Sequence, residues 1–299
     1  MPLPRLRLKA HINKALDVVV DASRRGLDRR GGRSLLGLLV AARWWVNNRL
    51  WVPVTYESEG YWLLHYPEAV VPSAAPRLVQ RPAETSELTA RDAFFHHYEP
   101  VAGDIVLDIG AGVGEEVNLL SRLVGDTGHV FAIEAHPTTY QWMQRRIAAN
   151  DLHNVTPLNL AITDTGGSVS IADDDNYLEN GLTTSTGLTV TAQTIPGLFE
   201  QLNLTQVDFL KMNIEGAEKE ALEGMGPVAT KVRHAAVSCH DFRADRGDGD
   251  WARTKTTVLA TLREQGFEVQ ERDAYPATDY WLRDYVYAHR TSDGIASST

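Results

Sequence analysis

The feature that most constrains this chain is an alternation that begins at residue 104: a short apolar strand, then a glycine or an acid, then a helix. Such βα units predict a parallel, doubly wound sheet that binds its ligands at the carboxyl ends of its strands. Strands are expected at "DIVLDIG" (104–110), "HVFAIEA" (129–135), "NVTPLNLAI" (154–162), "VDFLKMN" (207–213), "HAAVSCH" (234–240), "GFEVQE" (266–271) and "DYVYAHR" (284–290), and helices at 115–124, 137–150, 195–203, 216–224 and 251–265. The sequence therefore predicts an α/β domain built on a mostly parallel seven-stranded sheet.

Residues 1–83 lack this alternation and are expected to form a separate helical and hairpin appendage. The main domain is expected at 84–290, and residues 291–299 as a disordered tail. Shorter features are helices at 8–30, 34–48 and 85–100, a hairpin at 52–66, a proline-rich linker at 67–82, and polar loops at 173–191 and 243–251. The acidic start of the first loop could suggest calcium, but its glycine and closing glutamate are misplaced for a calcium loop, which favours a solvated loop.

Charge is unevenly distributed along the chain. Residues 1–50 carry +8, from nine Arg and two Lys against three Asp, so the rest carries −18 of the total of −10. An acidic main body argues against a nucleic-acid enzyme. The basic segment could touch an anionic partner, a membrane surface included. Its apolar run "SLLGLLVAARWWV" is too short to span a bilayer. The remaining alternatives are a helix that packs on its own domain, on a second copy in a homodimer, or on a membrane surface.

The expected compartment follows from two further observations. The single Cys239 excludes an intramolecular disulfide and a cysteine-based zinc cluster, which fits a reducing compartment. The first residues, "MPLPRLRLKAHINKALDVVV", lack an apolar core followed by a small-residue cleavage site. We therefore expect a cytoplasmic protein.

A glycine-rich loop follows the first strand of the main domain. In "VLDIGAGVGEEVN" (106–118) the strand ends in Asp108, and glycines at 110, 112 and 114 precede a helix. Glycines let a ligand approach the backbone, and the helix start offers free N–H groups. A dinucleotide site needs a small residue at position 115, where this chain has Glu115, followed by Glu116. Carboxylates would repel a pyrophosphate, so a cationic ligand such as S-adenosylmethionine is favoured.

The next two strands end in residues that suit the same ligand. The second strand ends in Glu134, where an acid can accept both hydroxyls of a ribose. The third ends in "NLAITD" (159–164), which places Ala161 and Ile162 where an adenine ring would lie. The alternative for Glu134 is a chance acid at a strand end.

These motifs together resemble the FkbM-type S-adenosylmethionine-dependent methyltransferases. The resemblance rests on Asp108-Ile-Gly-Ala-Gly, the Glu134-Ala-His-Pro turn, "NLAITD" and "LKMNIEGAEKEALEGM" (210–225), and it covers about residues 84–290. It implies a class I methyltransferase fold and O-methylation of a sugar, polyketide or other secondary-metabolite hydroxyl. The residues expected to bind the cofactor are Glu87, Asp108, Gly110, Ala111, Gly112, Gly114, Glu116, Glu134, Ala135, Ala161, Ile162 and Asn213.

The sequence departs from the family pattern at two places. Asn213 stands where the family usually has Asp, which weakens the case for a metal. "SCHDF" supplies His240 and Asp241 where the family commonly has an acid at a strand end, which suggests a different arrangement of substrate or base.

Candidate catalytic residues gather at the ends of two neighbouring strands. Lys211, Asn213 and Glu215 alternate and so share one face of their strand. We expect His240 to act as general base and Asp241 to orient it or to contact the substrate. For Lys211 a salt bridge to Glu215 or to another strand-end acid is the alternative.

Other assignments stay open at this point. Glu218 could be catalytic or a helix-start acid, and His96 and His97 are reserve bases. A divalent metal held by Asn213, Glu215, His240 and Asp241 is possible but not favoured. Rival functions are a nicotinamide oxidoreductase, disfavoured by Glu115, a non-catalytic scaffold, and an aminopropyl-transfer enzyme on the same fold.

Overall fold

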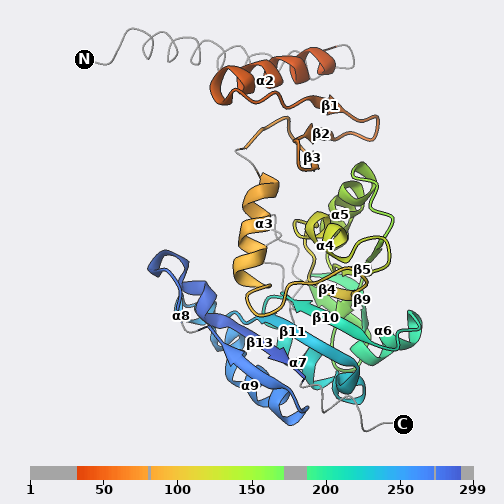
Figure 1. The fold of residues 1–299 in the computed structure, drawn as a ribbon, viewed down its shortest axis with the longest axis vertical. Helices are drawn as coiled ribbons and strands as arrows, with labels where there is room; N and C mark the ends of the chain where they lie inside the picture. The colour runs from red at the N-terminus through yellow and green to blue at the C-terminus, as the bar shows by residue number, and fades with distance from the viewer. Residues whose placement is uncertain (1–31, 80–81, 172–186, 273, 291–299) are drawn as a thin grey trace. The chain divides into compact units, whose positions relative to one another are not determined.

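The computed structural model describes residues 32–79, 82–171, 187–272 and 274–290 (Figure 1). The chain divides into two compact units: Met1–Thr85 with Ala148–Asn150, and Ser86–Ile147 with Asp151–Thr299. The predicted helix at 8–30, most of the basic segment and the tail at 291–299 lie outside the described residues. In the described part of the chain, no helix is long and apolar enough to cross a membrane.

The N-terminal unit is one helix packed on a small antiparallel sheet. Helix α2 (Arg33–Asn48) is followed by β1 (Val54–Tyr56), β2 (Trp62–His65) and β3 (Val70–Ser73). Its buried side chains are Leu36, Val40, Val52, Val54, Trp62, Leu64 and Tyr66. The predicted helix and hairpin are confirmed, but the linker predicted at 67–82 contains a third strand. Pro72 concealed it, because proline is tolerated only on an edge strand such as this one.

The larger unit is built on a seven-stranded sheet in the order β12-β13-β11-β10-β4-β5-β6. Only β13 runs antiparallel to its neighbours in this sheet. The strands are β4 (Ile105–Ile109), β5 (His129–Ile133), β6 (Val155–Leu158), β10 (Val207–Met212), β11 (Val232–Ser238), β12 (Glu268–Glu271) and β13 (Tyr285–His289). The mostly parallel seven-stranded sheet is as predicted.

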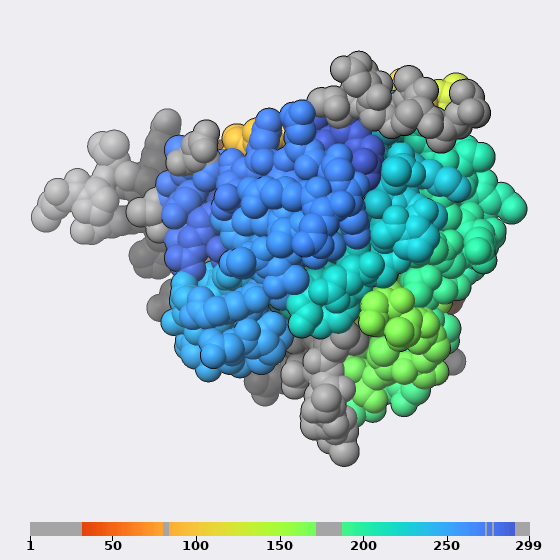
Figure 2. Space-filling view, turned by 90° about the horizontal axis from the view of Figure 1, so that it is seen from below, coloured from red at the N-terminus to blue at the C-terminus, as the bar shows by residue number. Residues whose placement is uncertain are grey.

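Helices cover both faces of this sheet, because side chains alternate along each strand. Phe209 of β10 joins a core with α3 (Pro82–Ala93), α4 (Val117–Val124) and α5 (Pro137–Ala149). Leu210 joins the opposite core with α6 (Ile195–Gln201), α7 (Glu218–Glu223) and α9 (Lys255–Glu264). Figure 2 shows the blue C-terminal segments lying against the cyan segments near residue 220, in line with the contact of α7 with α9.

A second, three-stranded sheet was not predicted. It contains β7 (Ala161–Ile162), β8 (Gly167–Ile171) and β9 (Leu188–Gln193) in the order β7-β9-β8. The strand predicted at 154–162 is therefore two strands in two sheets. The loop predicted at 173–191 is wrong for its last residues, where β9 begins, and the part at 173–186 lies outside the described residues.

The ends of several helices also differ from prediction. The helix predicted at 85–100 ends at Ala93, and the one predicted at 251–265 is a short 3-10 turn (Asp250–Ala252) followed by α9. The loop predicted at 243–251 overlaps a short helix, α8 (Asp241–Asp245). The helix predicted at 216–224 begins at Glu218, because Glu215 and Gly216 both adopt positive φ angles of 54° and 103°.

Candidate active site

A buried ion pair joins the two central strands of the large sheet. Lys211 of β10 and Asp108 of β4 are partners in the parallel register, and Lys211 Nζ lies 2.8 Å from Asp108 Oδ1. The ammonium also donates to the carbonyl of Gly110 at 2.9 Å and lies 4.9 Å from the centre of the Phe94 ring. Burial opposes the charge, but the carboxylates of Asp108 and Glu116 outweigh it and raise the pKa of Lys211. Of the two interpretations of Lys211, the structure bears out the salt bridge.

The glycine-rich loop is held against the end of β10. Gly110 has a φ of 76°, and a Cβ there would lie 1.9 Å from the carbonyl oxygen of Asn213, so only glycine fits. The backbone N–H of Asn213 donates to Ile109 at 2.9 Å. Gly112 is different: a Cβ at this position would meet nothing within 4 Å. The loop is thus anchored at its first glycine and open at its second, where a ligand can reach the backbone.

Glu134 closes the other side of this loop. Its Oε2 accepts from the N–H of Gly112 at 3.0 Å, and its Oε1 accepts from the N–H of His136 at 2.8 Å. Burial raises the pKa of Glu134. The side chain of Asn159 donates to the carbonyls of Glu134 and Ala135 at 2.8 and 2.9 Å, which fixes the end of β5. Glu134 therefore lies beside the glycine loop, as predicted.

The remaining predicted cofactor residues occupy different surroundings. Glu116 precedes α4, where burial raises its pKa to about 7. Ala111, Ala161 and Ile162 are buried, the last two in cores that flank the small sheet. Glu87 lies on α3 and accepts from the Arg122 guanidinium at 2.8 Å. Asp108 is fully buried, and its Oδ2 has no hydrogen-bond partner among the described residues.

A second charged cluster lies at the ends of β10 and β11. The ring of His240 bridges two carboxylates, with Nε2 3.1 Å from Glu215 Oε1 and Nδ1 2.9 Å from Glu218 Oε1. Glu218 is fully buried, whereas the Glu215 side chain retains 18% of its exposure. Glu215 also holds a φ of 54°, which is strained for a glutamate and is typical of functional positions. Glu215 is thus the member of this cluster that a ligand can reach.

This arrangement argues against His240 as the general base. Burial opposes the charged ring, but Glu218 and Glu215 outweigh it and raise the pKa of His240 to about 10. The imidazole is therefore a cation at neutral pH, and both of its nitrogens face carboxylates. Sequence reasoning proposed His240 as the base because it could not see that Glu215 and Glu218 converge on this ring.

Asp241 does not orient His240, which removes the first of its two predicted roles. Its Oδ1 accepts from the backbone N–H groups of Thr254 and Lys255 at 2.9 and 3.0 Å, which ties it to the start of α9. Glu218 orients the ring instead, and its Oε2 accepts from the Thr254 hydroxyl at 3.2 Å. Glu218 is the first residue of α7, as its helix-start interpretation expects, and its carboxylate also pairs with His240.

Arg243 was missed in the sequence because it lies in the segment interpreted as a solvated loop. Its Nη1 donates to Glu215 Oε2 at 2.8 Å and its Nε donates to Asp248 Oδ2 at 3.1 Å. Its guanidinium carbon lies 5.0 Å from the centre of the Trp251 ring. The one signal in the sequence is its position three residues after His240, which places it on α8 beside the site.

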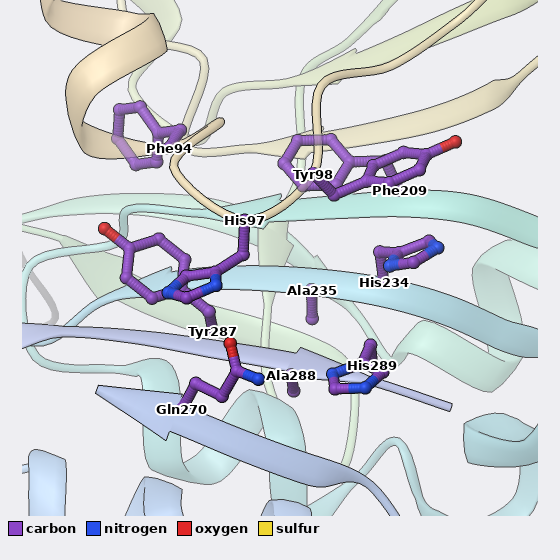
Figure 3. Close-up of a pocket in the computed structure, with 10 residues that line it drawn as sticks. All are labelled: Phe94, His97, Tyr98, Phe209, His234, Ala235, Gln270, Tyr287, Ala288 and His289. Carbon is purple, nitrogen blue, oxygen red and sulfur yellow. The ribbon is translucent and has the colours of Figure 1, made fainter. Parts of the chain in front are cut away.

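The reserve histidines belong elsewhere on the sheet. The rings of His96 and His97 pack on Tyr287, at 5.6 and 4.6 Å between centroids, and His97 lines a pocket of about 270 Å³ beside Phe209 and His234 (Figure 3). Within the described residues, no group of three or more His, Cys, Asp and Glu side chains is arranged to hold a metal ion.

The sheet and the anchored glycine loop define an α/β domain of the class I methyltransferase type. The family model named Methyltransferase FkbM domain matches residues 108–269, which is more than half of the chain. The chain belongs to this family. The matched residues include the glycine loop, Glu134 and the Glu215–His240–Glu218 cluster.

Individual relatives match over shorter stretches. The hexuronic acid methyltransferase AglP of Haloferax volcanii is 26% identical over 142 residues, which cover 46% of this chain and 56% of that protein. A protein-L-isoaspartate O-methyltransferase of Fervidobacterium nodosum is 31% identical over 112 residues, 37% of this chain and 50% of that protein. The chain spans about half the length of these relatives. The crystal structure of a methyltransferase FkbM from Methylobacillus flagellatus has a TM-score of 0.46 at 17% identity and covers 90% of this chain and 58% of that chain.

Removing the buried cation should destabilise the fold strongly. In Lys211→Met the carboxylate of Asp108 stays buried without its counter-ion, so we expect the free energy of unfolding in urea to fall by about 3–5 kcal/mol. Adding Asp108→Asn should recover part of the loss. The control is Lys219→Met, which breaks an exposed pair with Glu220 and should cost about 0–1 kcal/mol. Equal losses in the two single variants would contradict the role given to Lys211.

His240 should make stability depend on pH. Because its pKa in the fold, about 10, lies above the ordinary 6.5, its contribution is complete below about pH 6.5 and is lost as the pH rises toward 10. We expect the Tm to fall over this interval and the profile of His240→Gln to be flatter. His153→Gln, which alters a 76% exposed ring, is the control and should keep the wild-type slope. An unchanged slope in His240→Gln would refute the charged assignment.

Proposed function

We propose that this chain is an S-adenosyl-L-methionine-dependent O-methyltransferase that acts on a hydroxyl of a sugar or secondary-metabolite acceptor. The observation that carries the proposal is the charged cluster Glu215–His240–Glu218, which follows β10 and β11 on the side where β4 leads into the glycine loop. In an open α/β sheet, ligands bind at this edge. Family membership supports the cofactor, and the cluster supports removal of a proton from an acceptor.

The residues around the glycine loop fit the proposed cofactor. Gly112 leaves room for a ligand, and the Glu134 carboxylate beside it is placed to accept ribose hydroxyls. Asp108 offers a buried oxygen without a hydrogen-bond partner in the described part of the chain, and Glu116 adds a second acid. These acids suit a ligand with an amino group and a sulfonium. When bound, S-adenosyl-L-methionine supplies an electrophilic methyl group.

The acceptor side of the site handles the proton. A hydroxyl must lose its proton as it gains a methyl group, and a positioned side chain accelerates that loss. We propose that Glu215, the exposed member of its cluster, accepts this proton. His240 and Arg243 each contact one of its carboxylate oxygens, at 3.1 and 2.8 Å, and so hold it in place. Glu218 fixes the His240 ring from the opposite nitrogen.

The relatives support the class of acceptor. The protein-L-isoaspartate O-methyltransferase favours oxygen as the methylated atom, and the hexuronic acid methyltransferase favours a sugar as its carrier. At the end of β10, Glu215 and Glu218 each already face a cationic side chain, which favours proton transfer without a metal.

Replacing the proposed proton acceptor should abolish turnover and spare cofactor binding. We expect Glu215→Gln to lower kcat by about 10²–10⁴-fold, measured as release of S-adenosylhomocysteine with a panel of sugars, glycosides and phenols. Calorimetry should show wild-type affinity for the cofactor, since Glu134 and the glycine loop are unchanged. Glu223→Gln, on the exposed side of α7, should behave as wild type.

Three results would count against the proposal. Near-normal turnover of Glu215→Gln would show that the Glu215 carboxylate does not accept the proton. Loss of wild-type activity on addition of a chelator would show that a metal ion activates the hydroxyl in its place. Binding of a nicotinamide cofactor without any binding of S-adenosylmethionine would reject the methyltransferase itself.

A further inference from the structure

Trp251 is a large apolar side chain that the fold leaves exposed beside the charged cluster. Its residue is 51% exposed, although burying an indole is favourable. The ring is nevertheless held in place: its Nε1–H donates to the carbonyl of Asp248 at 2.8 Å, and the Arg243 guanidinium lies 5.0 Å from its centre. A fixed aromatic ring that stays exposed offers an apolar surface on which a ligand can stack.

Two glycines make room for this ring. A Cβ on Gly216 would lie 2.5 Å from its Cζ3, and a Cβ on Gly249 would lie 2.8 Å from its Cδ1. Both glycines also have left-handed φ angles, 103° and 120°, which favour glycine independently. The indole therefore lies directly on the backbone that follows Glu215. Any side chain at either glycine would push it away from the site.

Arg243 links the ring to the proposed proton acceptor. The same guanidinium that packs on Trp251 donates to Glu215 Oε2 at 2.8 Å. The indole is thus joined to the Glu215 carboxylate through one guanidinium. The surroundings are polar: Asp245, Asp248, Asp250, Arg246 and Arg253 lie in the same segment.

An aromatic surface with a polar rim matches a pyranose ring. One face of such a sugar presents C–H groups that pack on an indole, while its hydroxyls point outward and need hydrogen-bond partners. A flat phenol could also stack, but it offers one hydroxyl to this charged rim, whereas a pyranose offers several that can hydrogen-bond to it. The rim therefore favours a sugar over a phenol.

We propose that Trp251 is the stacking platform for a pyranose unit of the acceptor and determines specificity for carbohydrate. This inference rests on the proposed function and narrows it to one substrate class. Trp251 binds the acceptor and leaves the cofactor untouched. It acts on KM for the acceptor, whereas Glu215 acts on kcat.

Binding can be tested without turnover. In protein labelled with ¹⁵N-tryptophan, the indole N–H signal of Trp251 is assigned by its loss in Trp251→Phe. We expect addition of methyl β-D-glucuronide or methyl β-D-glucopyranoside at millimolar concentration to shift this signal and to leave that of Trp142 in place. Trp142 is the matched control, because it lies on α5 and also has an arginine, Arg145, 4.5 Å from its ring centre.

Kinetics then separate the platform from the chemistry. With whichever of the two glycosides is methylated, Trp251→Ala should raise KM by about tenfold or more, the loss of one good stacking contact, with little change in kcat. Trp251→Phe should recover most of the affinity, Trp142→Ala should match wild type, and calorimetry should give all three the wild-type affinity for S-adenosylhomocysteine.

The two proposals fail in different ways. A glycoside that is methylated with an unchanged KM by Trp251→Ala would overturn the platform and leave the methyltransferase standing. A phenol that is methylated while both glycosides fail to shift the Trp251 signal would also overturn it. Conversely, a shifted Trp251 signal without methyl transfer to any acceptor would support the platform and count against the proposed reaction.

Discussion

The ion pair between Lys211 and Asp108 is the interaction on which the site depends. Two fully buried charges are costly, and they persist only where each compensates the other and further hydrogen bonds are made. Here Lys211 also donates to Gly110, the first residue of the glycine loop. The pair therefore joins β10 to β4 at the level where the loop departs. This explains why a lysine stands in an otherwise apolar buried strand.

Charges on the two sides of this pair are balanced differently. On the side of the glycine loop, the carboxylates of Asp108, Glu116 and Glu134 all interact with the ammonium of Lys211. At the end of β10, Glu215 and Glu218 face two cations, His240 and Arg243. The first group keeps an excess of acid and suits a cationic ligand. The second group is close to neutral, and so suits an uncharged hydroxyl.

The sequence predicted the large sheet well because most of its strands are apolar and are followed by a glycine, an acid or a helix. It also placed Glu134 beside the glycine loop, since both follow neighbouring strands. It failed where the decisive partner is distant in the chain. Nothing in "SCHDF" shows that His240 meets Glu218 or that Asp241 turns to α9, and the strands of the small sheet are too short and too polar to stand out.

One turn after β10 shapes both halves of the acceptor region. Glu215 and Gly216 take consecutive positive φ angles, which the chain would avoid in an ordinary strand-to-helix junction. The turn brings the Glu215 carboxylate against His240 and Arg243, and it leaves Gly216 bare beneath the Trp251 ring. A residue with a side chain at 216 would disturb both the carboxylate and the ring. Gly216 is therefore required by the geometry of the site as well as by the turn that leads into α7.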